Sequence, residues 1–249
     1  MATFAQAAGS PRPLHKPPVL DCSAIDVAAG DDVRAALAST LSPVVALEGH
    51  GLAARCAAVA AAASAAHGAG HGARQEAFAL DGVADAAALK ADLVALARRA
   101  LAAVAPGFPP DAALDARFSL RRYPATGDGR DAPRLGAHVD NTLCTLLWST
   151  GPGLEVLAPR RDDAAWTAAD VRSVGLPTMG SEPKVVGDGD WAAVDARGGA
   201  VLFTPGEEWT RCAHTRAAAP LRSPTLHRVV LPGDETRLSL PLLVSLANP

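Results

Sequence analysis

Two histidines and one aspartate form the most specific chemical pattern in this sequence. His138 and Asp140 stand close together in the stretch GAHVDNTL, and His227 follows much later in PTLHRVV. Because residues i and i+2 of an extended strand project from the same face, His138 and Asp140 can present an imidazole and a carboxylate to one point. With His227 on a later strand, the three would occupy one face of an octahedral metal. That arrangement suits non-haem Fe(II) and leaves positions open for oxygen.

A cation and a hydroxyl follow the second histidine. Arg237 and Ser239 open the stretch RLSLPLL, which reads as a strand. On a strand the two side chains share a face, where a planar guanidinium fork and a hydroxyl can grip a carboxylate. The pattern therefore predicts that a dicarboxylate cosubstrate binds beside the metal.

These motifs together resemble the iron(II)- and 2-oxoglutarate-dependent oxygenases, in particular the plant-type branch that includes isopenicillin N synthase. The family pattern of His-x-Asp, a distant His and Arg-x-Ser occurs here in that order. Further similarities are the stretches GHGL, LRRYP, GLEVL and WAAV. The resemblance extends from about residue 18 to the end of the chain, and several motifs in the right order favour it over coincidence.

The resemblance implies an α+β fold with a double-stranded β-helix core, a jelly roll of the cupin-like kind, and flanking N-terminal helices. The implied ligands of Fe(II) are His138, Asp140 and His227. The residues implied to bind 2-oxoglutarate are Arg237, Ser239 and Tyr123. Dioxygen would be the oxidant and ascorbate is a candidate reductant. The implied reaction is hydroxylation, desaturation or cyclisation of a small metabolite.

Arg121 departs from the family pattern. Many plant-type members carry asparagine two residues before the tyrosine that corresponds to Tyr123, and this chain has arginine there. On a strand Arg121 and Tyr123 share a face, so we expect Arg121 to add an anion contact in the same cavity. We assign that contact to the substrate.

Three alternatives stay open at this point. Two histidines and a carboxylate also hold zinc, so a zinc hydrolase is a competing enzyme class, although it leaves Arg237 without a role. Oxidases of the isopenicillin N synthase type keep Arg-x-Ser without using 2-oxoglutarate. A non-catalytic module that binds a small acid would keep the barrel without the reaction.

The elements that must position these residues are a helix-rich beginning followed by many short strands. Alanine and leucine content predicts helices over 31–42, 52–67 and 84–104. Short apolar runs between Gly, Pro and Asp turns predict strands at 19–21, 44–47, 118–123, 143–148, 154–157, 200–203, 226–231 and 237–246. This succession is typical of an antiparallel barrel or jelly roll.

The length of 249 residues predicts one large domain. We place it at 18–249, after a flexible, proline-containing tail at 1–17, with a helix-rich part at 18–112 and the jelly-roll core at 113–249. The segment 159–190 is rich in charge, Gly and Pro, and it is too long for an ordinary hairpin connection. We expect this insert to act as a lid.

Charge and composition limit the partners. The chain has 23 Lys and Arg against 26 Asp and Glu, a formal net charge of -3, so no positive field would attract nucleic acid. No segment reads as a membrane span or a secretory signal. The four scattered cysteines form no CxxC pair and predict reduced thiols in a cytoplasmic protein. We expect a small-molecule substrate, and the oligomeric state is not readable from the sequence.

Overall fold

The computed structural model describes most of the chain outside one long central gap. The described residues are 14–23, 44–68, 75–125, 132–157, 191–195, 199–212, 224–231 and 234–247, together with 32, 34, 35, 127 and 215. The expected insert at 159–190 lies outside the described residues, as does most of the expected helix at 31–42.

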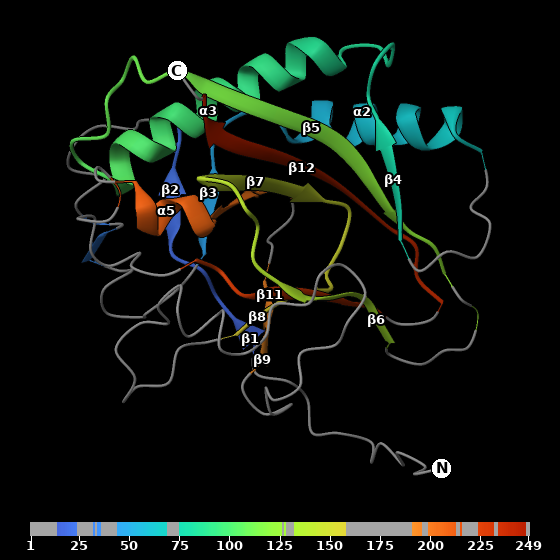
Figure 1. The fold of residues 1–249 in the computed structure, drawn as a ribbon. Helices are drawn as coiled ribbons and strands as arrows, with labels where there is room; N and C mark the ends of the chain where they lie inside the picture. The colour runs from blue at the N-terminus through green and yellow to red at the C-terminus, as the bar shows by residue number, and fades with distance from the viewer. Residues whose placement is uncertain are drawn as a thin grey trace.

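Two β-sheets form the body of the protein (Figure 1). In sheet order, the seven-stranded sheet consists of β2 (Val19–Asp21), β3 (Val45–Glu48), β10 (Val201–Pro205), β7 (Cys144–Ser149), β12 (Arg237–Leu246), β5 (Leu114–Tyr123) and β4 (Glu76–Ala79). The five-stranded sheet consists of β1 (Leu14–His15), β9 (Trp191–Val194), β8 (Leu154–Leu157), β11 (His227–Leu231) and β6 (Ala132–His138). All neighbouring strands are antiparallel except the pairs β1–β9 and β2–β3. The predicted double-stranded β-helix is confirmed.

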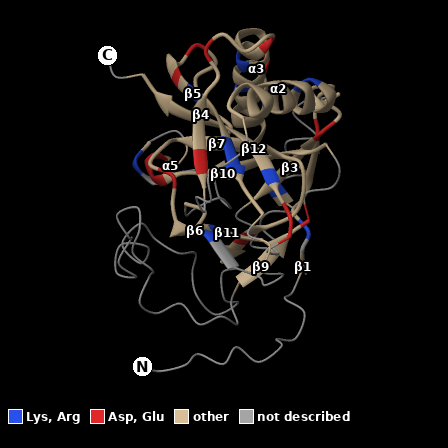
Figure 2. Ribbon diagram, turned by 90° about the vertical axis from the view of Figure 1, so that its right-hand side faces the viewer, with Lys and Arg blue, Asp and Glu red and all other residues tan. Residues whose placement is uncertain are grey.

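The two long helices in the described ranges cover the larger sheet. α2 (Ala53–Ala66) and α3 (Ala86–Val104) pack on the face of β5 and β12 that points away from the smaller sheet, as Figures 1 and 2 show from two directions. The leucines of α3 recur on one stripe and are fully buried against the sheet. A short helix, α5 (Glu207–Arg211), follows β10. None of the helices in the described ranges has the length and apolar character that a membrane span requires.

The period of two along each strand divides the side chains of the larger sheet between two environments. On β12, Leu240, Leu242 and Val244 belong to the apolar core under the helices. Arg237 and Ser239 point the other way, into the space between the two sheets. One strand therefore supplies both the main core and the interior of the barrel.

Several elements differ from the sequence-based expectation. The strand β4 and the helix α5 were not expected, because β4 (EAFA) has no β-branched residue and both elements are fixed by contacts with distant segments. β6 ends at His138, so Asp140 lies in the loop after the strand and not on it. β1 adds Leu14 and His15 to the smaller sheet, within the stretch that the sequence assigns to the tail. The extent of the domain stays a prediction.

Candidate active site

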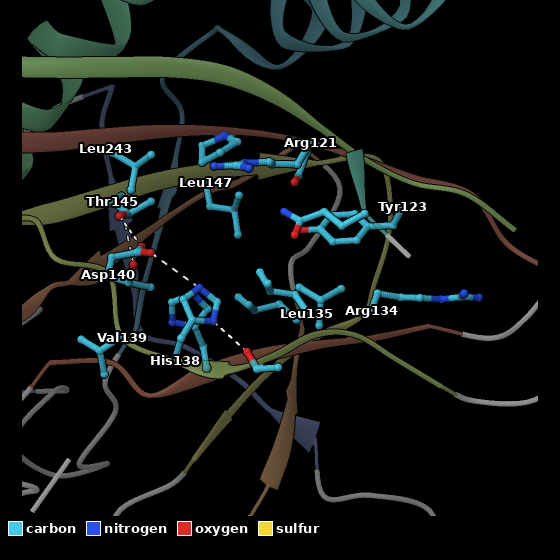
Figure 3. Close-up of a pocket in the computed structure, with 18 of the residues that line it drawn as sticks. Arg121, Tyr123, Arg134, Leu135, His138, Val139, Asp140, Thr145, Leu147 and Leu243 are labelled. Atoms are coloured by element: carbon cyan, nitrogen blue, oxygen red, sulfur yellow. Dashed lines mark hydrogen bonds and ion pairs between the residues drawn. The ribbon is translucent and has the colours of Figure 1, made fainter. Parts of the chain in front are cut away.

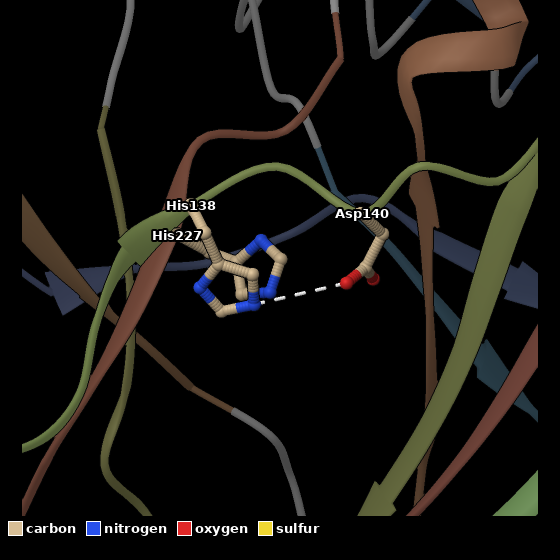
Figure 4. A group of neighbouring side chains, drawn as sticks. All are labelled: His138, Asp140 and His227. Atoms are coloured by element: carbon tan, nitrogen blue, oxygen red, sulfur yellow. Dashed lines mark ion pairs between the residues drawn. The ribbon is translucent and has the colours of Figure 1, made fainter. Parts of the chain in front are cut away.

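The structure brings His138, Asp140 and His227 together at one end of the barrel interior (Figure 4). His138 is the last residue of β6 and His227 the first of β11, and the two are paired across the antiparallel ladder. Their rings lie 4.2 Å apart between centroids, tilted by 53°. One potential ligand atom from each of the three residues lies within 4.8 Å of the others. Such a set of donors can hold one metal ion.

Backbone carbonyls orient both histidine rings. Nδ1 of His138 lies 2.8 Å from the carbonyl oxygen of Gly136, and Nδ1 of His227 lies 3.0 Å from that of Thr225. A carbonyl can only accept, so Nδ1 carries the proton in each ring and donates it. The lone pair of each neutral imidazole is then on Nε2, the atom available to a metal.

Asp140 is held by a side chain and by the backbone of α5. The hydroxyl of Thr145 donates to Oδ2 of Asp140 at 2.5 Å, whereas Oδ1 lies 3.7 Å from Nε2 of His138. The amide of Glu207 donates to the carbonyl of Asp140 at 2.7 Å. A Cβ atom on Gly206 would lie 2.2 Å from the carbonyl oxygen of Thr142, so only glycine allows α5 to approach this loop so closely. The loop that carries the carboxylate is therefore clamped from outside the cavity.

The cluster keeps His138 neutral. Burial lowers the pKa of His138 to about 4, and the neighbouring His227 adds to this effect, while the carboxylate of Asp140 opposes it. A neutral imidazole is the form that binds a metal.

A second group of polar side chains lies further along the same cavity. Arg237 faces Tyr123 across the β12–β5 ladder, and its guanidinium lies over the tyrosine ring at 5.5 Å from the centroid. Ser239 follows on the same face, and only 1% of its surface is exposed. Burial raises the pKa of Tyr123, so its hydroxyl is a protonated donor.

Arg237 has an unused hydrogen-bond donor. Only 3% of the residue is exposed, and burial lowers the pKa of its guanidinium. Nε donates to the carbonyl of Gly151 at 3.3 Å, but Nη1 is buried and has no hydrogen-bond partner among the described residues. A buried charged donor without a partner is costly, and a carboxylate ligand would satisfy it. Arg237 therefore fits one end of an organic acid.

Both groups line one cavity of about 800 Å³ between the sheets (Figure 3). A cavity of this size accommodates a small acid and a second small molecule. Arg121 also lines it, next to Tyr123 along β5. The structure thus brings together all seven residues that the sequence analysis assigns to the site.

Sequence reasoning missed two residues that position the aspartate, Thr145 and Gly206. Thr145 stands on β7 and reaches back to Asp140 across a loop, and Gly206 stands far along the chain. Thr145 follows the His-x-Asp motif closely, which was a usable signal. Nothing in the sequence around Gly206 points to this role.

Solved structures with the same architecture cover almost the whole chain. A rice dioxygenase for auxin oxidation aligns over 93% of this chain and 83% of its own, with a TM-score of 0.61 and 20% identity. The Arabidopsis thaliana dioxygenase for auxin oxidation 1, solved with 2-oxoglutarate, aligns over 94% and 93%, with a TM-score of 0.62 and 13% identity. JOX2, solved with 2OG, Fe and JA, aligns over 95% and 76%, with a TM-score of 0.59 and 16% identity.

Sequence comparison adds nothing to this result, since no family model and no curated protein matches the chain. The likeness at these identities concerns the fold. The chain has the double-stranded β-helix fold of the iron(II)- and 2-oxoglutarate-dependent oxygenases.

Proposed function

We propose that the protein is an Fe(II)- and 2-oxoglutarate-dependent oxygenase that oxidises a small-molecule substrate. One observation carries the proposal: a donor set of two histidines and one carboxylate shares a cavity with a buried guanidinium that has an unused N–H group. The donor set suits Fe(II) with open coordination positions, and the guanidinium suits the carboxylate of a cosubstrate. A zinc hydrolase would use the donor set of two histidines and one carboxylate, but it would leave Arg237 without a role.

The role of the protein's side chains would be to bind and orient the metal and 2-oxoglutarate. His138, Asp140 and His227 would hold the metal from one side, with the two Nδ1 hydrogen bonds and Thr145 fixing their directions. On the opposite wall, the far carboxylate of 2-oxoglutarate would be bound by Arg237, Ser239 and Tyr123. When bound, iron with 2-oxoglutarate and dioxygen supplies oxidising power that no side chain here provides.

The structural relatives favour a small-molecule substrate. Two of them are named as dioxygenases for auxin oxidation, and JOX2 was solved in complex with JA. The cavity of this chain is of a size for a molecule in that range. We therefore propose a small metabolite as the substrate.

Anaerobic calorimetry tests the proposal. Fe(II) should bind the wild-type protein, 2-oxoglutarate should bind the iron-loaded protein, and His138→Ala should weaken Fe(II) binding at least about 100-fold, because it removes one of three ligands. His67→Ala is the matched control, since His67 is exposed and stacks on Phe78 outside the cavity. Admission of oxygen should then yield succinate.

Three results would contradict the proposal. Fe(II) binding that is unchanged in His138→Ala would remove the metal assignment. Iron binding without any binding of 2-oxoglutarate would favour an oxidase of the isopenicillin N synthase type. A preference for zinc with hydrolytic turnover would favour the hydrolase instead.

A further inference from the structure

The cavity contains more positive charge than the proposed iron and cosubstrate require. Its described lining includes four arginines, Arg117, Arg121, Arg134 and Arg237, and one carboxylate, Asp140. The charges of Fe(II) and Arg237 are balanced by Asp140 and the two carboxylates of 2-oxoglutarate. Arg121 then has no counter-charge in the set of groups assigned so far. A positive charge in a partly buried cavity is costly without one, so a further anion is expected.

Two of the three remaining arginines are poorly placed to bind it. In Figure 3 the side chain of Arg134 extends away from His138 and Asp140. Arg117 is exposed and donates through Nη2 to Oδ1 of Asn141 at 3.4 Å, at the edge of the cavity.

Arg121 is the arginine that faces the interior without a partner. It is half-buried and lines the cavity, and it makes no hydrogen bond or ion pair with another residue in the part of the chain that the structure describes. The strand register places it opposite Ser239, in the row next to the Tyr123–Arg237 pair. Rows on one face are about 7 Å apart, so Arg121 is near the cosubstrate anchor but separate from it.

Apolar side chains lie beside Arg121. In Figure 3 its side chain extends from β5 away from Tyr123, toward the part of the cavity where Leu147 and Leu243 lie. Leu147 and Leu243 both line the cavity. A ligand held by the guanidinium could thus place an apolar portion against these leucines.

We propose that Arg121 binds the anionic group of the primary substrate, which is a small organic acid with an apolar portion. The inference rests on the proposed function, because it takes Arg237 as occupied by 2-oxoglutarate. A carboxylate and a phosphate share the chemistry that a guanidinium fork recognises. Arg121 is a substrate-binding residue in this scheme and contacts neither the metal nor its ligands.

Matched probes test this by calorimetry on protein loaded with Mn(II) and saturated with 2-oxoglutarate. The probes are phenylacetate, phenyl phosphate and phenylacetamide, which share a phenyl ring and differ in charge. We expect at least one anion to bind about 10-fold or more tightly than the amide, because a charge-assisted pair is worth that much. The anion that binds better identifies the carboxylate or the phosphate as the recognised group.

Variants assign the preference to Arg121. Arg121→Gln should abolish it, and Arg121→Lys should retain part of it, because lysine keeps the charge and loses the fork. Arg98→Gln is the control, since Arg98 lies on α3 and donates to the carbonyls of Pro110 and Ala112 outside the cavity. The affinity of Arg121→Gln for 2-oxoglutarate should stay within about threefold of the wild type.

The outcomes separate this inference from the function on which it rests. If wild-type protein binds 2-oxoglutarate but prefers neither anion to the amide, the inference alone is wrong. It is also wrong if the preference survives in Arg121→Gln, or if that variant loses 2-oxoglutarate affinity about 10-fold instead, which would assign Arg121 to the cosubstrate. If Mn(II)-loaded wild type does not bind 2-oxoglutarate, the proposed function itself fails.

Discussion

The two faces of the larger sheet carry opposite chemistry on the same strands. On the outer face of β12, Leu240, Leu242 and Val244 are at most 1% exposed and pack under the helices. On its inner face, Arg237 and Ser239 are also buried, at 3% and 1% exposed, yet they are polar and line a cavity. The outer face gains stability from apolar burial. The inner face includes Nη1 of Arg237, a buried donor that has no hydrogen-bond partner among the described residues, which is what a binding site requires.

Two adjacent arginines show the difference most directly. Arg122 points to the outer side, where it forms an ion pair with Glu76 at 2.5 Å, donates to the carbonyl of Gly68 and lies over the ring of Phe78. Arg121 points inward and has no such contact within the described ranges. The same residue type is therefore structural on one face and available to a ligand on the other.

The largest expected effect comes from substituting Arg122, the arginine on the outer face. Arg122→Gln should lower the free energy of unfolding by about 3 kcal/mol, because it removes both the ion pair with the half-buried carboxylate of Glu76 and the hydrogen bond to the carbonyl of Gly68. Urea denaturation measures this. Arg121→Gln should change the same quantity by less than about 0.5 kcal/mol, since no protein contact is lost. Equal destabilisation by both substitutions would contradict the distinction between the two faces.

The period of two made much of this arrangement predictable. It placed Arg237 with Ser239 and Arg121 with Tyr123 on shared faces, and the structure has them so. Short apolar runs between turn residues predicted β2, β8 and β12 with the bounds that the structure shows. Alternation within one strand is a local property, so a sequence reveals it directly.

Contacts between distant segments were not predictable in the same way. The pairing of His138 with His227 depends on which strands become neighbours, so the sequence could offer it as a possibility and the resemblance to a known family supported it, but no local pattern fixed it. The partner of Arg122 is Glu76 on β4, whose sequence EAFA has no β-branched residue to mark it as a strand. The packing of Gly206 against the loop that carries Asp140 depends on a close backbone approach, which leaves no pattern in the sequence.

The next effect in size concerns the inner arginine of β12. Arg237→Leu should weaken binding of 2-oxoglutarate to the metal-loaded protein about 100-fold, because a charge-assisted contact is lost. The same variant without ligand should be more stable by about 1 kcal/mol, since a buried charge with an unused donor is replaced by an apolar side chain. Calorimetry and urea denaturation measure the two quantities.

Arg237→Lys separates charge from shape in this experiment. Lysine keeps the positive charge but cannot offer the planar fork, so the affinity should lie between those of the wild type and the leucine variant. Unchanged 2-oxoglutarate binding in Arg237→Leu would show that Arg237 does not bind the carboxylate of 2-oxoglutarate.

The smallest effect tests how finely the inner face is arranged around the metal. Thr145 lies on β7 and donates to Oδ2 of Asp140 at 2.5 Å, which leaves Oδ1 on the side of the histidines. Thr145→Val keeps the shape and removes the hydroxyl. Without this hydrogen bond the carboxylate can rotate, so Fe(II) affinity should fall about 10-fold.

A neighbouring threonine provides the matched control for Thr145. Thr204 pairs with Thr145 across the β7–β10 ladder, lines the same cavity and donates only to the backbone carbonyl of Thr145, at 3.5 Å, among the described groups. Thr204→Val should therefore leave the Fe(II) affinity unchanged in an anaerobic titration. If both valine variants weaken the metal equally, the loss reflects general disturbance of the inner face. A loss of affinity confined to Thr145→Val would be due to the orientation of Asp140, because Thr145 contacts that carboxylate and Thr204 does not.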